Sequence, residues 1–243
     1  MSSAVIAGGR TSGRSFFSSM ALMMLAFALI GFAPSFYLRG LVHYPRPNPS
    51  LNPLIVLHGL LFTLWLLVFW TQARLIGAGR RDLHMKLGIA GMLLAAVLIP
   101  LMYLTAVGGV ARASAPPFTT PLAWTAVPLA CLAAYIPLLW LGWKHRRNAA
   151  AHKRLMLCAA LLMMGPAVGR FPIAPPVLAG HAIQQFLAWC TVIPLLVYDR
   201  RTLGQLHWAT KLGASLTGAS VLLGIAGIVV PGWAALAAHL PGV

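Results

Sequence analysis

Long apolar runs separated by short basic loops fill almost the whole of this chain. Runs of about 18 or more apolar residues predict transmembrane helices, because a helix that rises about 1.5 Å per residue needs roughly 20 residues to cross the hydrocarbon layer. Seven such runs predict helices over residues 16–32, 51–73, 83–107, 121–143, 150–169, 177–198 and 208–230. The pattern therefore indicates an all-α fold, an integral membrane bundle of seven transmembrane helices.

The two ends of the chain differ from this pattern. Residues 1–15 are small, polar and rich in Gly and Ser, which predicts a disordered N-terminal tail and leaves 16–243 as a single transmembrane helical domain. The first apolar run has the features of a signal peptide, with cleavage near Ala33, but its length and the lack of a clear cleavage site favour a retained first helix. The stretch from Pro231 onward is too short to cross and is expected at the interface, with Trp233 as its anchor.

The distribution of charged residues predicts how the bundle is oriented in the membrane. The chain is 60% apolar, has only two acidic residues and carries a formal net charge of +16. Such a charge would suggest nucleic-acid binding in a soluble protein. Here the basic residues stand in short loops beside the spans, which favours contact with anionic lipid head groups and argues against a nucleic-acid partner. Fourteen of the 18 Lys and Arg residues fall on the side of the N-terminus, so the N-terminus is expected in the cytoplasm and the C-terminus outside.

Four of the eight histidines are placed at matching depths in this topology. His58 and His181 each stand a short way into a helix that descends from the outer face, and His84 and His152 stand in the first turns of helices that rise from the cytoplasm. A histidine within a membrane span costs free energy unless it is paired or ligated. If the second, third, fifth and sixth helices form the core, each pair can face across the bundle.

Haem b suits such pairs chemically. Two neutral imidazoles on facing helices can ligate one iron, which predicts one or two haems, held by His58 with His181 and by His84 with His152. Gly88 and Gly91 share a helix face with His84 and would let a porphyrin approach the backbone. Arg170 is a candidate partner for a propionate group. The alternative is that the first-turn histidines are merely interfacial and the deeper ones pack between helices.

Three stretches carry a resemblance to a known family. They are LHGLLFTLWLLVFWTQ, GRRDLHMKLG and AHKRLMLCAALLMMGPAVGRFP, and together they cover about a fifth of the chain. They resemble an uncharacterised family of multi-pass bacterial membrane proteins with HGxLFTxW, LHRxLG and HKRLML motifs, which implies a bacterial inner membrane location. His58, His84 and His152 match the histidines of these motifs, His181 rests on position alone, and Met85 stands where the family usually has arginine.

The topology and the histidine layout are also similar, more loosely, to di-haem b-type transmembrane cytochromes. The predicted function is therefore a b-type cytochrome-like protein that passes electrons across or within the bilayer, with a quinone or another redox partner as a possible reactant. The alternative is a non-redox transporter, channel or assembly factor with structural or metal-binding histidines. The predicted spans contain no carboxylate, which excludes a retinal protein and argues against an ion-coupled transporter.

Overall fold

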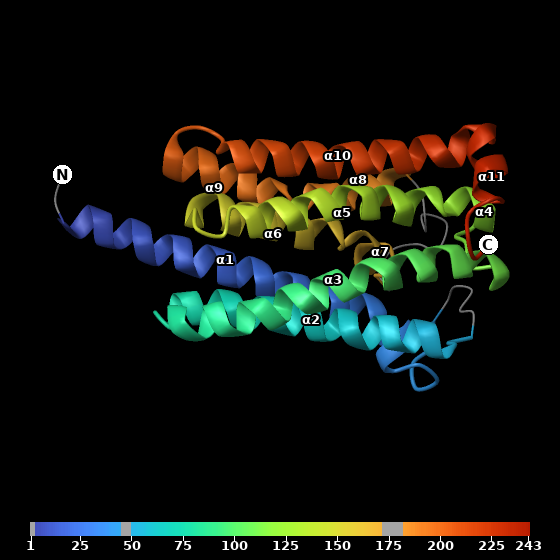
Figure 1. Cartoon of the computed structure of the whole chain (residues 1–243), viewed down its shortest axis with the longest axis horizontal. Helices are drawn as coiled ribbons and strands as arrows, with labels where there is room; N and C mark the ends of the chain where they lie inside the picture. Colours follow the sequence, from blue (N-terminus) through green and yellow to red (C-terminus); the bar gives the residue numbers. More distant parts are fainter. Residues whose placement is uncertain (1–2, 45–49, 172–181) are drawn as a thin grey trace.

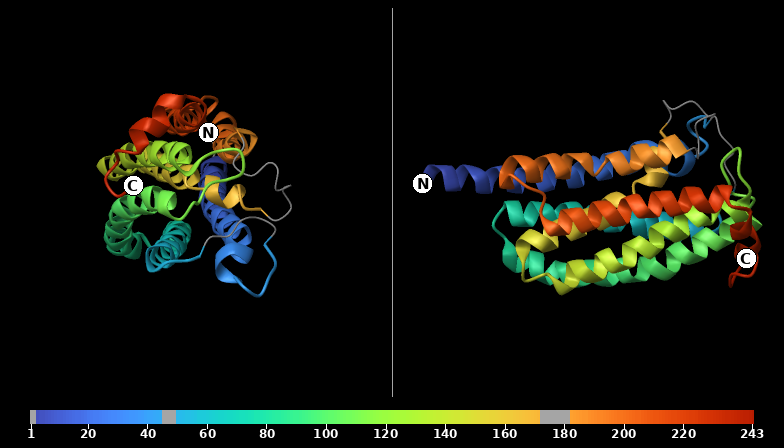
Figure 2. Two further views of the ribbon diagram at one scale, coloured as in Figure 1. Left: turned by 90° about the vertical axis from the view of Figure 1, so that its right-hand side faces the viewer. Right: turned by 90° about the horizontal axis from the view of Figure 1, so that it is seen from above.

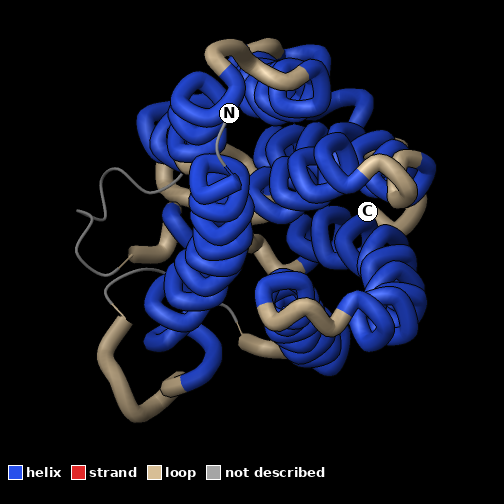
Figure 3. The backbone as a smooth tube through the Cα atoms, turned by 90° about the vertical axis from the view of Figure 1, so that its left-hand side faces the viewer, coloured by secondary structure: helices blue, strands red, loops and turns tan. Residues whose placement is uncertain are grey.

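The computed structural model describes residues 3–44, 50–171 and 182–243, and the described part is helical with no strand (Figures 1 and 3). The elements in chain order are α1 (Ser3–Phe32), the π-helix η1 (Ala33–Tyr37), α2 (Pro53–Gly77), α3 (Arg81–Ala111), α4 (Pro121–Trp124), α5 (Ala126–Lys144), α6 (Ala149–Leu162), α7 (Gly165–Val168), α8 (Ala182–Cys190), α9 (Ile193–Leu203), α10 (Trp208–Val229) and α11 (Pro231–Ala237). The long helices run roughly side by side along one axis (Figure 2).

Six segments of the described chain are long and apolar enough to cross a membrane. They are Ser15–Tyr37, Pro53–Gly77, Arg81–Ala111, Pro121–Lys144, Ala182–Leu203 and Trp208–Val229. Their outward faces carry exposed leucines, isoleucines and valines, as expected for surfaces in contact with lipid. The helical class and the multi-pass character predicted from the sequence are therefore confirmed. Helix α1 begins at Ser3, earlier than the predicted start at Phe16.

The predicted helix over 150–169 is interrupted in the structure. It forms α6 and α7, with a break at Met163 and Met164. The helices α4, α6 and α8 end at Trp124, Leu162 and Cys190, and a proline follows each of these residues at the fourth position. A proline has no N–H to donate to the carbonyl four residues earlier and its ring crowds that carbonyl, so a break there is expected.

Helix α6 lies in the interior of the bundle and is the most completely buried element. Almost every residue from Arg154 to Leu162 is buried, and the helix packs mainly against α5 and α10, with further contacts to α1 and α8. Helix α2 packs mainly against α1 and α3. The seventh predicted helix, α10, packs mainly against α5 and α6. The predicted core of the second, third, fifth and sixth helices is not confirmed.

The turns 78–80, 145–148 and 204–207 all lie at the end of the bundle near the N-terminus, whereas α4, α11 and the C-terminus lie at the other end (Figure 1). We call the first of these the basic end, because the clusters Arg80–Arg81 and Lys144–Arg147 are found there. The short helix α11 closes the opposite end, where Trp233 Nε1 donates a hydrogen bond to Thr125 Oγ1 at 3.1 Å.

Candidate functional site

Two of the predicted histidines meet at the basic end of the bundle. His84 lies in the first turn of α3 and His152 in the first turn of α6. Their ring centroids are 6.2 Å apart and their planes make an angle of 82°. The structure therefore brings together the inner pair that the sequence predicted from helix depth alone.

The local structure around the pair fixes one ring more firmly than the other. Asn148 caps α6 by accepting hydrogen bonds from the backbone N–H groups of Ala150 and Ala151 at 3.2 Å, which fixes the start of the helix and hence the position of His152. The Nδ1 atom of His152 lies 2.8 Å from the carbonyl oxygen of Gly142 on α5. His152 Nδ1 therefore carries the proton in this contact, and Nε2 is left as the basic nitrogen. His84 Nδ1 is buried and has no hydrogen-bond partner.

The separation of the rings can be compared with that needed by a metal ion. An imidazole nitrogen binds a transition metal at about 2.0–2.1 Å and lies about 1.1 Å from the ring centre, so two imidazoles on opposite sides of one ion have centroids about 6.3 Å apart. The observed 6.2 Å fits this value. A backbone carbonyl that holds the second ring nitrogen, as Gly142 does for His152, is the usual support of a metal-ligating histidine. The distance between the rings is thus of the length that a bis-imidazole iron would need, and no third His, Cys, Asp or Glu joins the pair among the described residues.

Of the predicted outer pair, His58 and His181, only His58 lies among the described residues. His58 lies in the second turn of α2, its ring centroid is 5.8 Å from that of Phe62, and its Nδ1 is buried without a hydrogen-bond partner. His181 lies outside the described residues, so the pairing of His58 with His181 stays a prediction. An aromatic stripe continues from Phe62 through Trp65 to Phe69 at centroid spacings of 5.7 Å, toward the basic end of α2.

The three other predicted cofactor-binding residues have contacts within the protein. A Cβ on Gly88 would lie 3.4 Å from Gln72 Nε2, and one on Gly91 would lie 3.1 Å from Val68 Cγ1, so both glycines face α2 and allow close packing of α2 on α3. Arg170 donates a hydrogen bond to the carbonyl of Pro166 at 3.0 Å and lies over the Phe32 ring at 5.0 Å. Its charge also interacts with His58. A role of these residues beside a porphyrin stays a prediction.

A buried ion pair beside the inner histidines was missed by the sequence analysis. Arg154, two residues after His152, is 2% exposed and donates hydrogen bonds from Nε and a terminal nitrogen to Asp199, which is 0% exposed. Asp199 also accepts from Thr210 Oγ1 at 2.6 Å and from the backbone N–H of His207 at 3.0 Å. Arg154 is therefore not available to lipid head groups. The prediction that no carboxylate lies in a membrane helix is wrong, because Asp199 lies in α9, which extends to Leu203. Nothing in the sequence separated Asp199 from Asp82, which also stands beside an apolar run but pairs with Arg80 at an exposed position.

This network also reaches the N-terminus of α10, where His207 is the capping residue. Its Nδ1 accepts a hydrogen bond from the backbone N–H of Ala209 at 3.1 Å. Burial lowers the pKa of His207 below its ordinary value, and the positive charge of Arg154 lowers it further. A neutral His207 is therefore part of the folded state at this end of the bundle.

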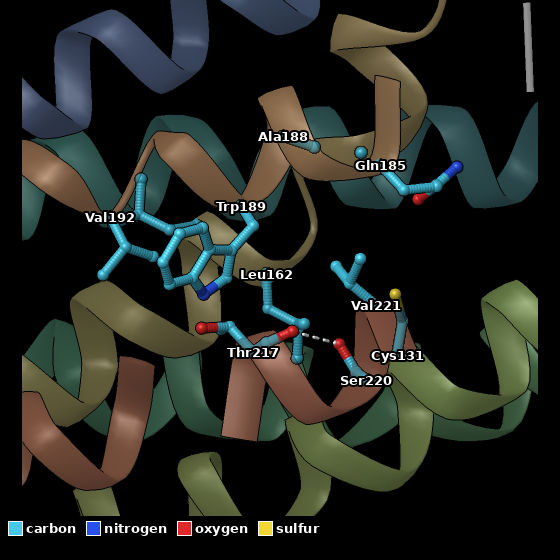
Figure 4. A pocket seen from close by; sticks show the side chains of 11 residues that line it. Cys131, Leu162, Gln185, Ala188, Trp189, Val192, Thr217, Ser220 and Val221 are labelled. Carbon is cyan, nitrogen blue, oxygen red and sulfur yellow. Dashed lines mark hydrogen bonds between the residues drawn. The ribbon is translucent and has the colours of Figure 1, made fainter. Parts of the chain in front are cut away.

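A small pocket lies at the interruptions of two helices (Figure 4). Leu162 and Gly165 line it from the break between α6 and α7, and Trp189 and Val192 line it from the break between α8 and α9. Its other lining residues are Cys131, Leu161, Gln185, Ala188, Thr217, Ser220 and Val221. The volume of about 20 Å³ is enough for one or two water molecules, since one water needs about 10–15 Å³ on this measure. The lining contains neither His84 nor His152, so this pocket is separate from the inner pair.

Comparison of the chain with protein-family models, with curated proteins and with solved structures finds no match.

Proposed function

We propose that this chain is a membrane-embedded, b-type cytochrome-like protein that passes electrons across or within the bilayer through bis-histidine haem. The observation that carries the proposal is the inner pair, whose ring separation of 6.2 Å matches that of two imidazoles on one metal ion. The support of His152 Nδ1 by the Gly142 carbonyl and the buried, unpaired nitrogen of His84 add to it. Three of the four proposed ligands, His58, His84 and His152, fall in the stretches that resemble the HGxLFTxW, LHRxLG and HKRLML motifs.

Haem, when bound, supplies the one-electron chemistry, and the chain contributes binding and a low dielectric. His84 and His152 would hold the inner iron from α3 and α6. His58 and His181 would hold a second iron nearer the opposite end. Ligation requires both imidazoles to be neutral.

The proposal includes an orientation and a location. The predicted N-terminus in the cytoplasm, seven crossings and external C-terminus would place the basic end against the anionic inner leaflet of a bacterial inner membrane. The interrupted pair α6 and α7 would then be the seventh crossing, and its burial among other helices explains why it presents less apolar surface toward lipid. A quinone or another redox partner would exchange electrons with the haems.

The test is the absorption spectrum of the protein purified in a mild detergent from a haem-sufficient host. We expect Soret and α bands that sharpen on addition of dithionite, and haem quantification should give one or two haems per chain. His84→Ala and His152→Ala should each remove the same haem, while His58→Ala and His181→Ala should each remove the other. His145→Ala is the matched control, because His145 lies at the same end of the bundle but makes an edge contact with the Trp208 ring at a centroid distance of 5.1 Å.

A colourless wild-type protein refutes the proposed function. Haem content that is unchanged in both His84→Ala and His152→Ala refutes the assignment of the inner ligands. Loss of haem in His145→Ala to the same degree would show that the losses report general damage to the bundle.

We propose a transporter as the second candidate, on one specific observation. Two interrupted helices line the same pocket, and their breaks at residues 163–164 and 191–192 lie about 18–21 Å from the basic end, near the middle of a bilayer. Discontinuous helices that meet near the midplane form the substrate sites of many secondary transporters. A colourless protein that moves a solute into proteoliposomes would favour this candidate, and Thr217→Val or Ser220→Ala should then impair uptake.

A further inference from the structure

Three buried polar atoms close to the inner pair have no hydrogen-bond partner. They are Nδ1 of His84 and both amide atoms of Gln72, Nε2 and Oε1. A buried polar group without a partner costs about 1–3 kcal/mol, and most such groups in folded proteins are paired. Unpaired groups on two adjacent helices can be satisfied when their side chains turn toward each other.

The two residues lie on adjacent helices. Gln72 is in the last two turns of α2 and His84 is in the first turn of α3, and these helices pack against each other around the turn 78–80. Gln72 Nε2 lies 3.4 Å from the Cβ position of Gly88, which is one helical turn beyond His84 on the same face. The backbone carbonyl of Gln72 also lies within hydrogen-bonding reach of the His84 ring. Because Gly88 has no side chain, the Gln72 amide can pack directly against the backbone of α3.

We infer that Gln72 is a positioning residue for His84. Its Oε1 accepts a hydrogen bond from the Nδ1–H of His84, which holds the ring in one tautomer and leaves Nε2 as the ligand nitrogen. The role in ligation rests on the proposed function, whereas the hydrogen bond itself does not.

The arrangement gives the two ligands equivalent support. His152 Nδ1 already contacts the carbonyl of Gly142 at 2.8 Å, and Gln72 would provide the corresponding oxygen for His84. Metal-ligating histidines almost always donate their second N–H to a carboxylate, a carbonyl or a water molecule, which fixes the ring and raises the basicity of the ligand. Gln72 is the nearby side chain with a buried, unpaired carbonyl oxygen.

The first test does not need a bound cofactor. Nitrogen-15 NMR of histidine-labelled protein in detergent, with the His84 signals assigned from a His84→Asn variant, reports which ring nitrogen carries the proton. We expect His84 to be a hydrogen-bonded Nδ1–H tautomer in the wild type and to lose that signature in Gln72→Leu. Gln185→Leu is the matched control, since Gln185 lies on α8 at the separate pocket and should leave the His84 signals unchanged. Identical His84 signals in the wild type and Gln72→Leu overturn the inference.

The second test uses the haem-loaded protein and reads the affinity and the reduction potential. Gln72→Leu should weaken haem binding about 10–100-fold, as the loss of such supporting contacts does in other metal sites, and should raise the potential. Gln72→Glu keeps an acceptor of greater strength, so it should retain the haem and lower the potential below that of the wild type. A purely structural role would not move the potential in opposite directions in the two variants.

The outcomes separate this inference from the proposed function. If the wild type binds no haem, the proposed function fails, while the NMR result still decides whether Gln72 holds His84. If haem is bound and the potential is the same in the wild type, Gln72→Leu and Gln72→Glu, the inference fails and the proposed function stands.

Discussion

The buried pair of Arg154 and Asp199 allows a sharp test of how this bundle is held together. Asp199 on α9 accepts hydrogen bonds from Arg154 on α6, from Thr210 on α10 and from the backbone of His207, so one carboxylate joins three helices. Asp199→Asn keeps the shape of the side chain but replaces one acceptor oxygen with an amino group. The guanidinium, 2% exposed, then has no counter-charge.

Removing one partner of a buried ion pair costs about 3–5 kcal/mol, mainly because the remaining charge stays buried without compensation. We therefore expect Asp199→Asn to lower the free energy of unfolding by about 3–5 kcal/mol. Combining it with Arg154→Met removes both charges and retains an amide oxygen for Thr210 and His207. The double variant should be at least about 2 kcal/mol more stable than Asp199→Asn alone, because neutral replacements of buried pairs are often tolerated.

The assay is reversible unfolding in mixed micelles by SDS titration, followed by tryptophan fluorescence and circular dichroism. Asp82→Asn is the matched control. Asp82 also pairs with an arginine, Arg80, at 3.2 Å, but both side chains are more than half exposed, so its loss should leave the free energy of unfolding nearly unchanged. A loss of less than about 1 kcal/mol in Asp199→Asn, or a double variant no more stable than the single one, would refute the reasoning.

Two further predictions concern α10. Gly213→Ala places a Cβ 2.3 Å from Cys158 Sγ on α6, so it should destabilise the bundle by about 1–3 kcal/mol. Adding Cys158→Ala to the same chain should restore part of the lost stability in a thermal melt. Unchanged stability of the single variant would contradict this close packing. The cap formed by His207 requires an unprotonated Nδ1, and the pKa of His207 is lowered in the folded state, so its stabilisation is present above pH 6.5 and is lost as the pH falls through the lowered pKa. His207→Asn, which caps without titrating, should make unfolding less sensitive to acid over that range, and an unchanged pH profile would count against the cap.

Part of the candidate site was predictable because it depends only on the positions of residues along the chain. The positions of His84 and His152 relative to the ends of their apolar runs set their depths, and equal depth on two helices that run in the same direction lets the two rings meet where the helices face each other. The ion pair was not predictable in this way, since Arg154 and Asp199 are 45 residues apart and each stands near a helix end, where a charge is normally solvated.

The sequence by itself determined the helical class, the multi-pass character and the concentration of basic residues at one end. Each of these depends on a local property, namely the hydrophobicity of about 20 consecutive residues or the charge of a short loop. The sequence also contains the cause of each helix interruption, a proline four residues after the last residue of the helix. Pro100 and Pro137 have the same chemistry, however, and lie within the continuous helices α3 and α5. Only the tertiary structure decided which prolines break a helix, which helix is buried in the centre, and that Arg154 faces Asp199 instead of lipid. These outcomes depend on which neighbours fill the space around each residue, and that is set by the packing of helices distant in sequence.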